Sequence, residues 1–437
     1  MKKDRGKTGT GKGFNLQNNS SLQGLNAKLF KKHLKTKIFK YLCFSSLAFC
    51  FCLLALLVLF TAKSAYKGMF LTSVKLSINT SLASKLAINN PDEQSIAFEA
   101  LKENYNLESK LTPQELSLLQ KEVFAAYKDN NKLSEFIEKK YSKGDTFRGG
   151  EIWIPASAKL DRYYKESFLY KNEALMSTAY NNLIIELVNN NAIKIKPSFA
   201  IFTNTDSRYS EIAGLMAALK GTLYMIGIFF VFCVPMSIIT ALYLEEFAKD
   251  SFFKKITEVN ITNLASIPSI IYGLLGLLVF INYMHLPRSS SIVGGLTLSL
   301  LVMPVLIVSA RNSIKSVPRI IRDMAFAMGA SRSRVVFSIV LPSALPGILT
   351  GIILTLARLI GETAPLLIIG MVAFIGSNPT SVLMPASAIP VQIYLWSSSP
   401  DYILINKASA LILMLITFLL ASNIVINIIR KRFEIKW

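Results

Sequence analysis

The sequence predicts an all-α polytopic membrane protein with six transmembrane helices and a small α+β soluble domain inserted between the first two helices. Apolar residues make up 52% of the 437 positions and the mean hydropathy is +0.42, which is more than a soluble fold requires. Several apolar runs are long enough to cross a bilayer, so we expect these segments to be surrounded by membrane lipid. The formal charge of +21 is concentrated in the amino-terminal tail and in short loops, which is typical of cytoplasmic segments and disfavours nucleic acid as a partner.

The chain begins with a basic segment, residues 1–37, that we expect to be a cytoplasmic tail. Eleven Lys and Arg residues stand against one acid in residues 1–40. Residues 6–12 read GKTGTGK and match the spacing of a phosphate-binding loop. Gly13 stands where that loop requires Ser or Thr, and the five preceding residues leave no room for a strand. We therefore interpret this motif as part of a flexible tail, and the chain has no ATPase motif of its own.

Residues 38–62 are expected to form the first transmembrane helix. The run is apolar apart from Lys40 and a few hydroxyl groups, and at about 1.5 Å per residue it is long enough to cross about 30 Å of hydrocarbon. A cleaved signal peptide is the alternative, but its apolar region is usually about 7 to 15 residues long. A retained anchor with a cytoplasmic amino end agrees better with the sequence.

Residues 63–211 are expected to form the soluble domain, on the extracytoplasmic side. Positions 64 to 211 hold nineteen basic and eighteen acidic residues and no run of spanning length. Alternating apolar residues indicate strands at 73–78 and 192–201. Thr112, Pro113 and Glu115 form the signature of a capping box before a helix that reaches about residue 127. The domain is either a structural collar or a docking surface for an extracytoplasmic partner.

Five further spans are expected in residues 212–437, and both termini are then cytoplasmic. Gly273 and Gly276 have the spacing of a close helix–helix contact. Residues 311–334 carry six basic groups against one acid, as a cytoplasmic loop should, whereas residues 245–258 favour neither side. All four cysteines lie in apolar runs, which predicts neither a disulfide framework nor a metal site. The expected spans are 221–244, 261–283, 292–310, 345–375 and 408–429.

Arg358 and Glu362 are two ionisable residues near the middle of the expected fifth span. A charge at this depth costs at least about 2.5 to 3.5 kcal/mol, so such residues are candidates for function. Their spacing of four places both on one face of a helix. A guanidinium group binds tetrahedral oxyanions through two hydrogen bonds, so these residues and the adjacent Thr363 are candidates for a substrate path. A pair that only holds helices together is the alternative.

Residues 311–343 form a charged, amphipathic interruption between two apolar spans. Pro318 is expected to start a short helix that Gly329 stops, and Ser331 can cap a second helix ending at Pro342. The spacing resembles the coupling signature of ABC importer membrane subunits, with Asp323 in place of the usual Glu and Met324 in place of the first Ala. The positions in register are Ala325, Gly329, Ile339, Leu341 and Pro342.

From about residue 214 onward the sequence resembles the A-type permease subunits of phosphate-specific ABC transporters. The resemblance is carried by ALYLEEF, LASIPSIIYGLL, MPVLIVSARNSIKSVP and ARLIGETAPLL, whereas Arg311 departs from the acid expected in many relatives. It implies six helices of the ABC importer type in a bacterial inner membrane. It also implies a heterodimer with a second permease subunit, two copies of a cytoplasmic ATPase that uses ATP and Mg²⁺, and an extracytoplasmic phosphate-binding protein. No cofactor is expected in this chain.

Three hypotheses follow. The first is a permease subunit for phosphate, or for another tetrahedral oxyanion, that needs a separate ATPase. The second is a secondary carrier that uses Glu362 as a proton relay, which should show internal repeats that the sequence lacks. The third is a membrane receptor that senses through residues 64–211, but this leaves the intramembrane pair and the coupling signature without a purpose.

Overall fold

The computed structural model describes residues 16–78, 93–124, 150–165 and 178–433. The chain divides into two compact units, Met1–Phe60 and Thr61–Trp437. The GKTGTGK motif lies outside the described residues. Helix α1 (Leu16–Met69) makes up the described part of the first unit and continues into the second. Its segment Thr36–Met69 is long and apolar enough to cross a membrane, and the predicted first span falls within it.

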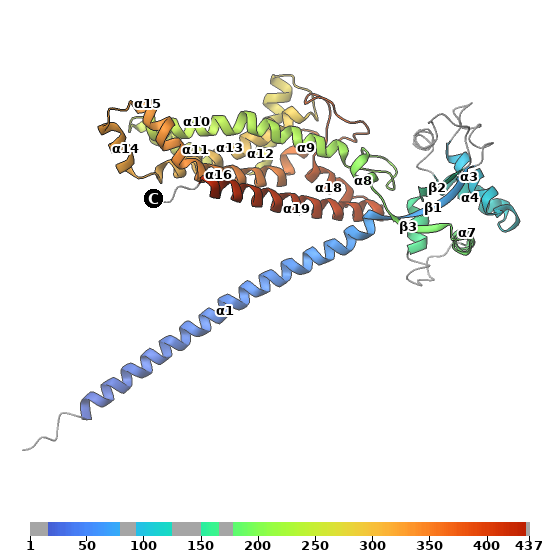
Figure 1. The fold of residues 1–437 in the computed structure, drawn as a ribbon, viewed down its shortest axis with the longest axis horizontal. Coiled ribbons are helices and arrows are strands. Elements are labelled where there is room, and N and C mark those ends of the chain that lie inside the picture. Colours follow the sequence, from blue (N-terminus) through green and yellow to red (C-terminus); the bar gives the residue numbers. More distant parts are fainter. Residues whose placement is uncertain (1–15, 79–92, 125–149, 166–177, 434–437) are drawn as a thin grey trace, which may run out of the picture. The chain divides into compact units, whose positions relative to one another are not determined.

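A three-stranded antiparallel sheet forms the centre of the α+β region (Figure 1). Strand β1 (Phe70–Ile78) lies between β2 (Gly150–Pro155) and β3 (Ile193–Pro197). Alternate residues of β1, Val74 and Leu76, are fully buried, because one face of the sheet packs against helices. The helices of this region are α3 (Glu93–Asn104), η1 (Leu107–Ser109), α4 (Pro113–Glu122), α6 (Ala158–Tyr163), α7 (Thr178–Asn189) and α8 (Ala200–Thr203).

Local sequence signals predict this region with mixed success. The capping box is confirmed: Thr112 Oγ1 accepts from the backbone N–H of Glu115, and a Glu115 carboxylate oxygen accepts from the backbone N–H of Thr112. The predicted strand at 192–201 is too long, since β3 ends at Pro197 and residues 200–203 are helical. Strand β2 has no counterpart in the prediction.

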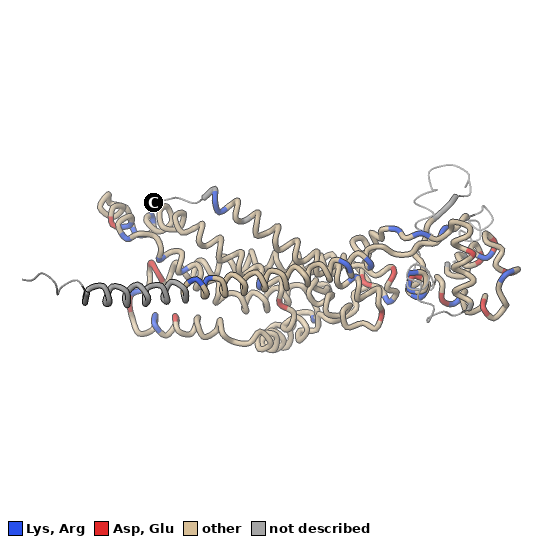
Figure 2. The backbone as a smooth tube through the Cα atoms, turned by 90° about the horizontal axis from the view of Figure 1, so that it is seen from below, with Lys and Arg blue, Asp and Glu red and all other residues tan. Residues whose placement is uncertain are grey.

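The remainder of the chain is a bundle of helices, and the predicted helical membrane core with a small α+β region is confirmed. Among the residues that the structure describes, five helices are long and apolar enough to cross a membrane, or six if one bent pair counts as a span. Figure 2 shows long stretches of the core helices that carry no charged residue. The candidate spans are Thr36–Met69, Met216–Phe247, Ser291–Lys315, Arg332–Gly361 and Tyr402–Lys431, and the bent pair is Phe252–Leu264 with Ser269–Tyr283.

The second span contains α9 (Met216–Ile228), η5 (Phe229–Cys233), α10 (Val234–Leu242) and η6 (Tyr243–Phe247). Helix α13 (Ser291–Lys315) lies at the centre of the bundle and contacts α9, α10 and α16 (Leu341–Gly361). About two thirds of its most apolar 18-residue stretch, 67%, is buried. The last span is α19 (Tyr402–Phe433).

Two predicted spans are wrong in outline. The third, expected as one helix over 261–283, is instead α11 (Phe252–Leu264), a bend of 101° and then α12 (Ser269–Gly276) with η7 (Leu277–Tyr283). The bend falls just before Pro268, which has no N–H to continue a helix. The fifth, expected to reach residue 375, ends at Gly361 and is followed by α17 (Ala364–Ile368), irregular chain and α18 (Ile389–Ser397).

The two glycines of α12 allow the close contacts that their spacing predicts. A Cβ atom at Gly273 would lie 2.8 Å from the Cα atom of Pro365 in α17. A Cβ atom at Gly276 would lie 2.3 Å from Oγ1 of Thr297 in α13. The first contact is with backbone, which cannot rotate away, so the position of α12 against α17 depends on the absence of a side chain at Gly273.

We therefore expect Gly273→Ala to destabilise the protein by about 1 to 3 kcal/mol through overpacking. Gly227→Ala is the matched control, because a Cβ atom there meets no atom within 4 Å. Thermal unfolding of the two purified variants in detergent measures the difference. Equal melting temperatures would contradict the close contact with Pro365.

A buried lysine joins the end of the α+β region to the last span. Lys407 is fully buried, and its Nζ donates to the carbonyl oxygens of Ser210 (2.6 Å), Glu211 (3.2 Å) and Ala213 (2.7 Å). The Glu211 side chain is itself buried, and this desolvation raises its pKa to about 7 although the charge of Lys407 acts in the opposite direction. The carboxyl group of Glu211 therefore titrates near neutral pH.

The raised pKa of Glu211 predicts a pH-dependent stability. The folded state holds this proton more tightly than the unfolded state, so stability falls as pH rises from about 4.5 to about 7. Gln mimics the protonated acid, so Glu211→Gln should be more stable than wild type at pH 8, by at most about 3 kcal/mol, and nearly equal at pH 5. Melting temperatures across this range test it, with the exposed Glu108→Gln as control. If the melting temperatures of wild type and Glu211→Gln changed with pH in the same way, Glu211 would not titrate in this range.

Candidate functional site

Two short helices between α13 and α16 make an elbow, defined here as residues 318–335. Helix α14 (Arg319–Ala327) follows Pro318 as expected, and α15 (Arg332–Val335) is capped by the hydroxyl of Ser331, which accepts from the backbone N–H of Arg334. Gly329 has φ of +81°, a left-handed conformation that glycine adopts without strain. The predicted turn at Gly329 is therefore confirmed.

The second helix of the elbow does not end at Pro342. It continues from α15 through a π-helical segment, η8 (Val336–Val340), into α16, so that residues 332–361 form one span. Pro342 lies inside this run, two residues after the π-helical segment ends. The elbow is thus built directly onto the fifth span.

The residues of the coupling signature separate into buried and exposed groups. Ala325 is buried against the core, and Ile339 and Leu341 pack partly against it. Asp323, Gly329 and Pro342 are exposed. Next to them the elbow exposes large apolar side chains, which a solvated surface does not favour. These are Ile320 (69% exposed), Met324 (54%), Phe326 (46%) and Met328 (80%).

Ion pairs fix the elbow to the end of the second span. Arg322 of α14 donates to Oε1 of Glu246 from Nε (3.2 Å) and from Nη2 (2.8 Å). Arg332 of α15 donates to the backbone carbonyl of Glu246 and lies over the ring of Phe247, 5.6 Å from its centroid. Both helices of the elbow therefore contact residues 246–247.

A second ionic group lies beside the first. Arg311 of α13 is buried between Glu245 and Glu258, with 2.6 Å from Nε and from Nη2 to the two carboxylates. Lys315 lies 3.4 Å from Glu245. This explains the mixed charge of residues 245–258, since two of its acids pair with the basic end of α13. These ion pairs were not predicted from the sequence. The one signal that could have indicated them was Arg311, which departs from the acid expected in many relatives.

Arg358 and Glu362 lie near each other, as expected. They do not lie in the middle of a helix, where the sequence had placed them. Glu362 follows the last residue of α16 and has extended backbone, so the pair lies at the end of the span. Arg358 Nε lies 3.6 Å from Glu362 Oε1, and 39% of the Arg358 side chain is exposed. Within the described ranges, the guanidinium group makes no hydrogen bond, so its donors remain open to a ligand. Thr363 is the next residue, in the break before α17.

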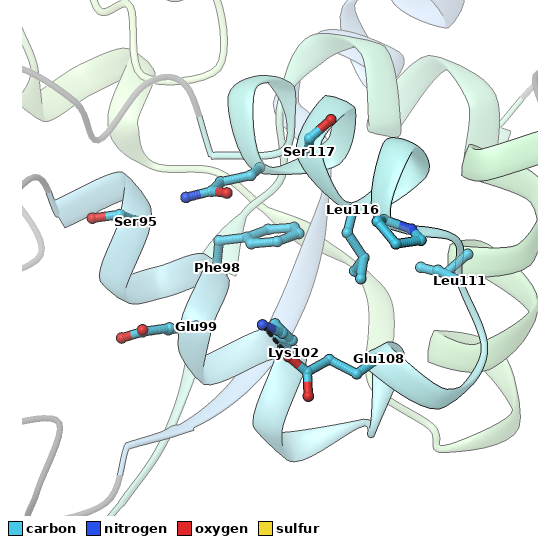
Figure 3. A pocket seen from close by; sticks show the side chains of 10 residues that line it. Ser95, Phe98, Glu99, Lys102, Glu108, Leu111, Leu116 and Ser117 are labelled. Carbon is cyan, nitrogen blue, oxygen red and sulfur yellow. Dashed lines mark ion pairs between the residues drawn. The ribbon is translucent and has the colours of Figure 1, made fainter.

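The α+β region has a separate cavity of about 660 Å³ between α3 and α4 (Figure 3). Phe98, Leu111 and Leu116 supply apolar lining, and an ion pair between Lys102 and Glu108 lies at its edge. Glu99 adds a second acid. Two carboxylates against one lysine disfavour an anion such as phosphate in this cavity.

Comparison with known proteins identifies the family. Residues 233–436 match the family model described as binding-protein-dependent transport system inner membrane component. The phosphate transport system permease protein PstA of Haemophilus influenzae is 32% identical over 228 residues, which cover 52% of this chain and 79% of that protein. PstA of Yersinia pestis is 33% identical over 233 residues, covering 53% and 78%.

Among solved structures, an inward-facing MetNI methionine ABC transporter is 17% identical with a TM-score of 0.40, covering 50% of this chain and 97% of that chain. The resemblance seen in the sequence motifs is confirmed by the permease relatives. The chain belongs to the family of binding-protein-dependent transport system inner membrane components, and as a permease component it is not itself catalytic.

Proposed function

We propose that this chain is a transmembrane permease subunit of an ATP-driven importer of inorganic phosphate. The observation that carries the proposal is Arg358, a guanidinium group with open hydrogen-bond donors at the end of the helix that starts in the elbow. The phosphate in the names of the PstA relatives supports the substrate class. Another tetrahedral oxyanion is the nearest alternative, because the same donors would bind it.

In this proposal Arg358, Glu362 and Thr363 line the substrate path. The guanidinium group of Arg358 offers paired donors to an oxyanion. The carboxylate of Glu362 competes with that oxyanion for the positive charge of Arg358. The distance of 3.6 Å between them is longer than a hydrogen bond, so an arriving anion breaks none. Glu362 and Thr363 lie in a helix break, and irregular backbone at membrane depth is tolerated where it lines a cavity.

The elbow is the proposed socket for a cytoplasmic ATPase. Its exposed apolar side chains would be covered by that partner, which would also supply ATP and Mg²⁺. The signature residues Asp323, Ala325, Gly329, Ile339, Leu341 and Pro342 shape the socket. A second permease subunit, two ATPase copies and an extracytoplasmic phosphate-binding protein would complete the complex, with residues 64–211 on the outer side and both termini in the cytoplasm.

Two other function classes are less well supported. A proton-coupled carrier would use Glu362 without any ATPase, which leaves the apolar face of the elbow uncovered. A receptor would need no oxyanion-binding arginine at the end of a span. Phosphate uptake that continues without ATP would favour the carrier.

Arg358→Ala should reduce phosphate uptake to background, because it removes the only guanidinium group of the proposed path, while the complex stays assembled. Uptake of radioactive inorganic phosphate into proteoliposomes measures the loss, and co-purification of the ATPase measures assembly. Arg208→Ala is the matched control, since Arg208 is exposed and lies outside the candidate spans. Normal uptake by Arg358→Ala would remove Arg358 from the substrate path.

Gly329→Val should weaken ATPase binding and uptake together. The site has open space, so the cost comes from the backbone φ of +81°, which a β-branched residue strongly disfavours. Gly329→Asn should retain much more of both, because Asn tolerates the left-handed conformation. Co-purification of the ATPase and phosphate uptake are measured for each variant. Equal behaviour of Val and Asn would show that the turn geometry is unimportant.

A further inference from the structure

Two neighbouring glutamates at the end of the second span make different contacts. Glu245 faces the bundle, where it pairs with Arg311 and Lys315 of α13. Glu246 faces the elbow, where it pairs with Arg322 of α14. The side chains of Glu246 and Arg322 are only 12% and 15% exposed, so this pair is largely shielded from water. One residue therefore holds the span in the core and the next holds it to the elbow.

Arg322 makes more than one contact at this point. Its Nη1 donates to the carbonyl oxygen of Val317 (2.5 Å) and its Nη2 to that of Ile314 (2.9 Å). The same guanidinium group thus binds the end of α13, the start of the elbow and the Glu246 carboxylate. On the other side, Arg332 of α15 binds the backbone of Glu246. A displacement of α14 must move residue 246 or break a shielded ion pair, and a displacement of α15 must move it or break an exposed hydrogen bond.

We propose that Glu246 is a positioning residue that transmits movement of the elbow to the second span, Met216–Phe247. The inference rests on the proposed function, since it requires an ATPase that moves the elbow. Glu246 does not contact substrate and acts through Arg322 and Arg332. Separating a shielded carboxylate from its partner leaves an uncompensated charge, so moving as one unit is the less costly response.

Through the contacts of Glu246, movement of the elbow acts on two spans, the second and the fifth. The fifth span begins at Arg332 within the elbow itself, so it follows the elbow through continuous helix. The second span has no such continuity with the elbow, because its last residue, Phe247, lies 71 positions before Pro318. The described links between the two are the contacts of residues 246 and 247. Loss of the Glu246 charge should therefore weaken the link between α14 and the second span, while the contacts of Arg332 with residues 246 and 247 remain and the fifth span stays attached.

The test uses the full chain in complex with its ATPase, reconstituted in proteoliposomes. Glu246→Gln should lower the amount of inorganic phosphate taken up per ATP hydrolysed by about fivefold or more, in the usual range for coupling between sites, with ATPase co-purification retained. Glu246→Asp keeps the charge and should restore part of the phosphate uptake per ATP hydrolysed. Arg322→Gln combined with Glu246→Gln should be no worse than Arg322→Gln alone, because both act through one contact. Asp250→Asn is the matched control, since its pair with Lys254 lies nearby and Asp250 is 95% exposed.

Each result separates the inference from the proposed function. A wild-type complex that takes up no phosphate would overturn both. Wild-type uptake with an unchanged ratio in Glu246→Gln would overturn the role of Glu246 and leave the proposed function standing. Loss of the ATPase in both Glu246→Gln and Glu246→Asp would show a purely structural role and would also overturn the inference.

Discussion

The buried guanidinium group of Arg311, held between two carboxylates, is the interaction on which the half of the core next to the elbow depends. Lipid provides no hydrophobic force that would bring apolar helices together, so close packing and interhelical hydrogen bonds decide their arrangement. Arg311 connects α13 with the second span through Glu245 and with α11 through Glu258. The elbow then attaches to this fixed base through Glu246. The ionic contacts thus form an ordered series from the bundle outward.

The end of the bundle next to the α+β region is held by a different kind of contact. Lys407 donates hydrogen bonds to three backbone carbonyl oxygens at the end of the α+β region. Tyr402, one turn earlier on α19, donates from its hydroxyl to the carboxylate of Asp161, which also accepts from Lys165. The α+β region is therefore attached to the last span at two points. Such an attachment suits either a collar or a docking surface that must keep a fixed position.

The sequence predicts the features that depend on neighbouring residues. The capping box at Thr112, the turn at Gly329 and the close approach at Gly273 are each specified within a few positions. Contacts between distant residues could not be predicted in this way. Glu245 and Arg311 are 66 positions apart, and nothing in either segment selects the other as its partner.

Helix ends were also difficult to predict, because apolar composition does not distinguish a helix from buried irregular chain. Composition placed Glu362 inside a span that reaches residue 375, whereas the helix ends one residue before it. Pro342 was expected to end a helix, but the helical run Arg332–Gly361 continues through it. The candidate residues Arg358 and Glu362 were thus identified correctly as neighbours but placed at the wrong depth of the helix.

The unbroken run from Arg332 to Gly361 has a mechanical consequence. Thirty helical residues measure about 45 Å at about 1.5 Å per residue, so this helix is a lever with the elbow at one end and Arg358 close to the other. A tilt of a few degrees at the elbow would shift the far end by several ångströms. Arg358 and Glu362 both lie at that far end, so a small rotation at the elbow would move the two charges together relative to the neighbouring helices.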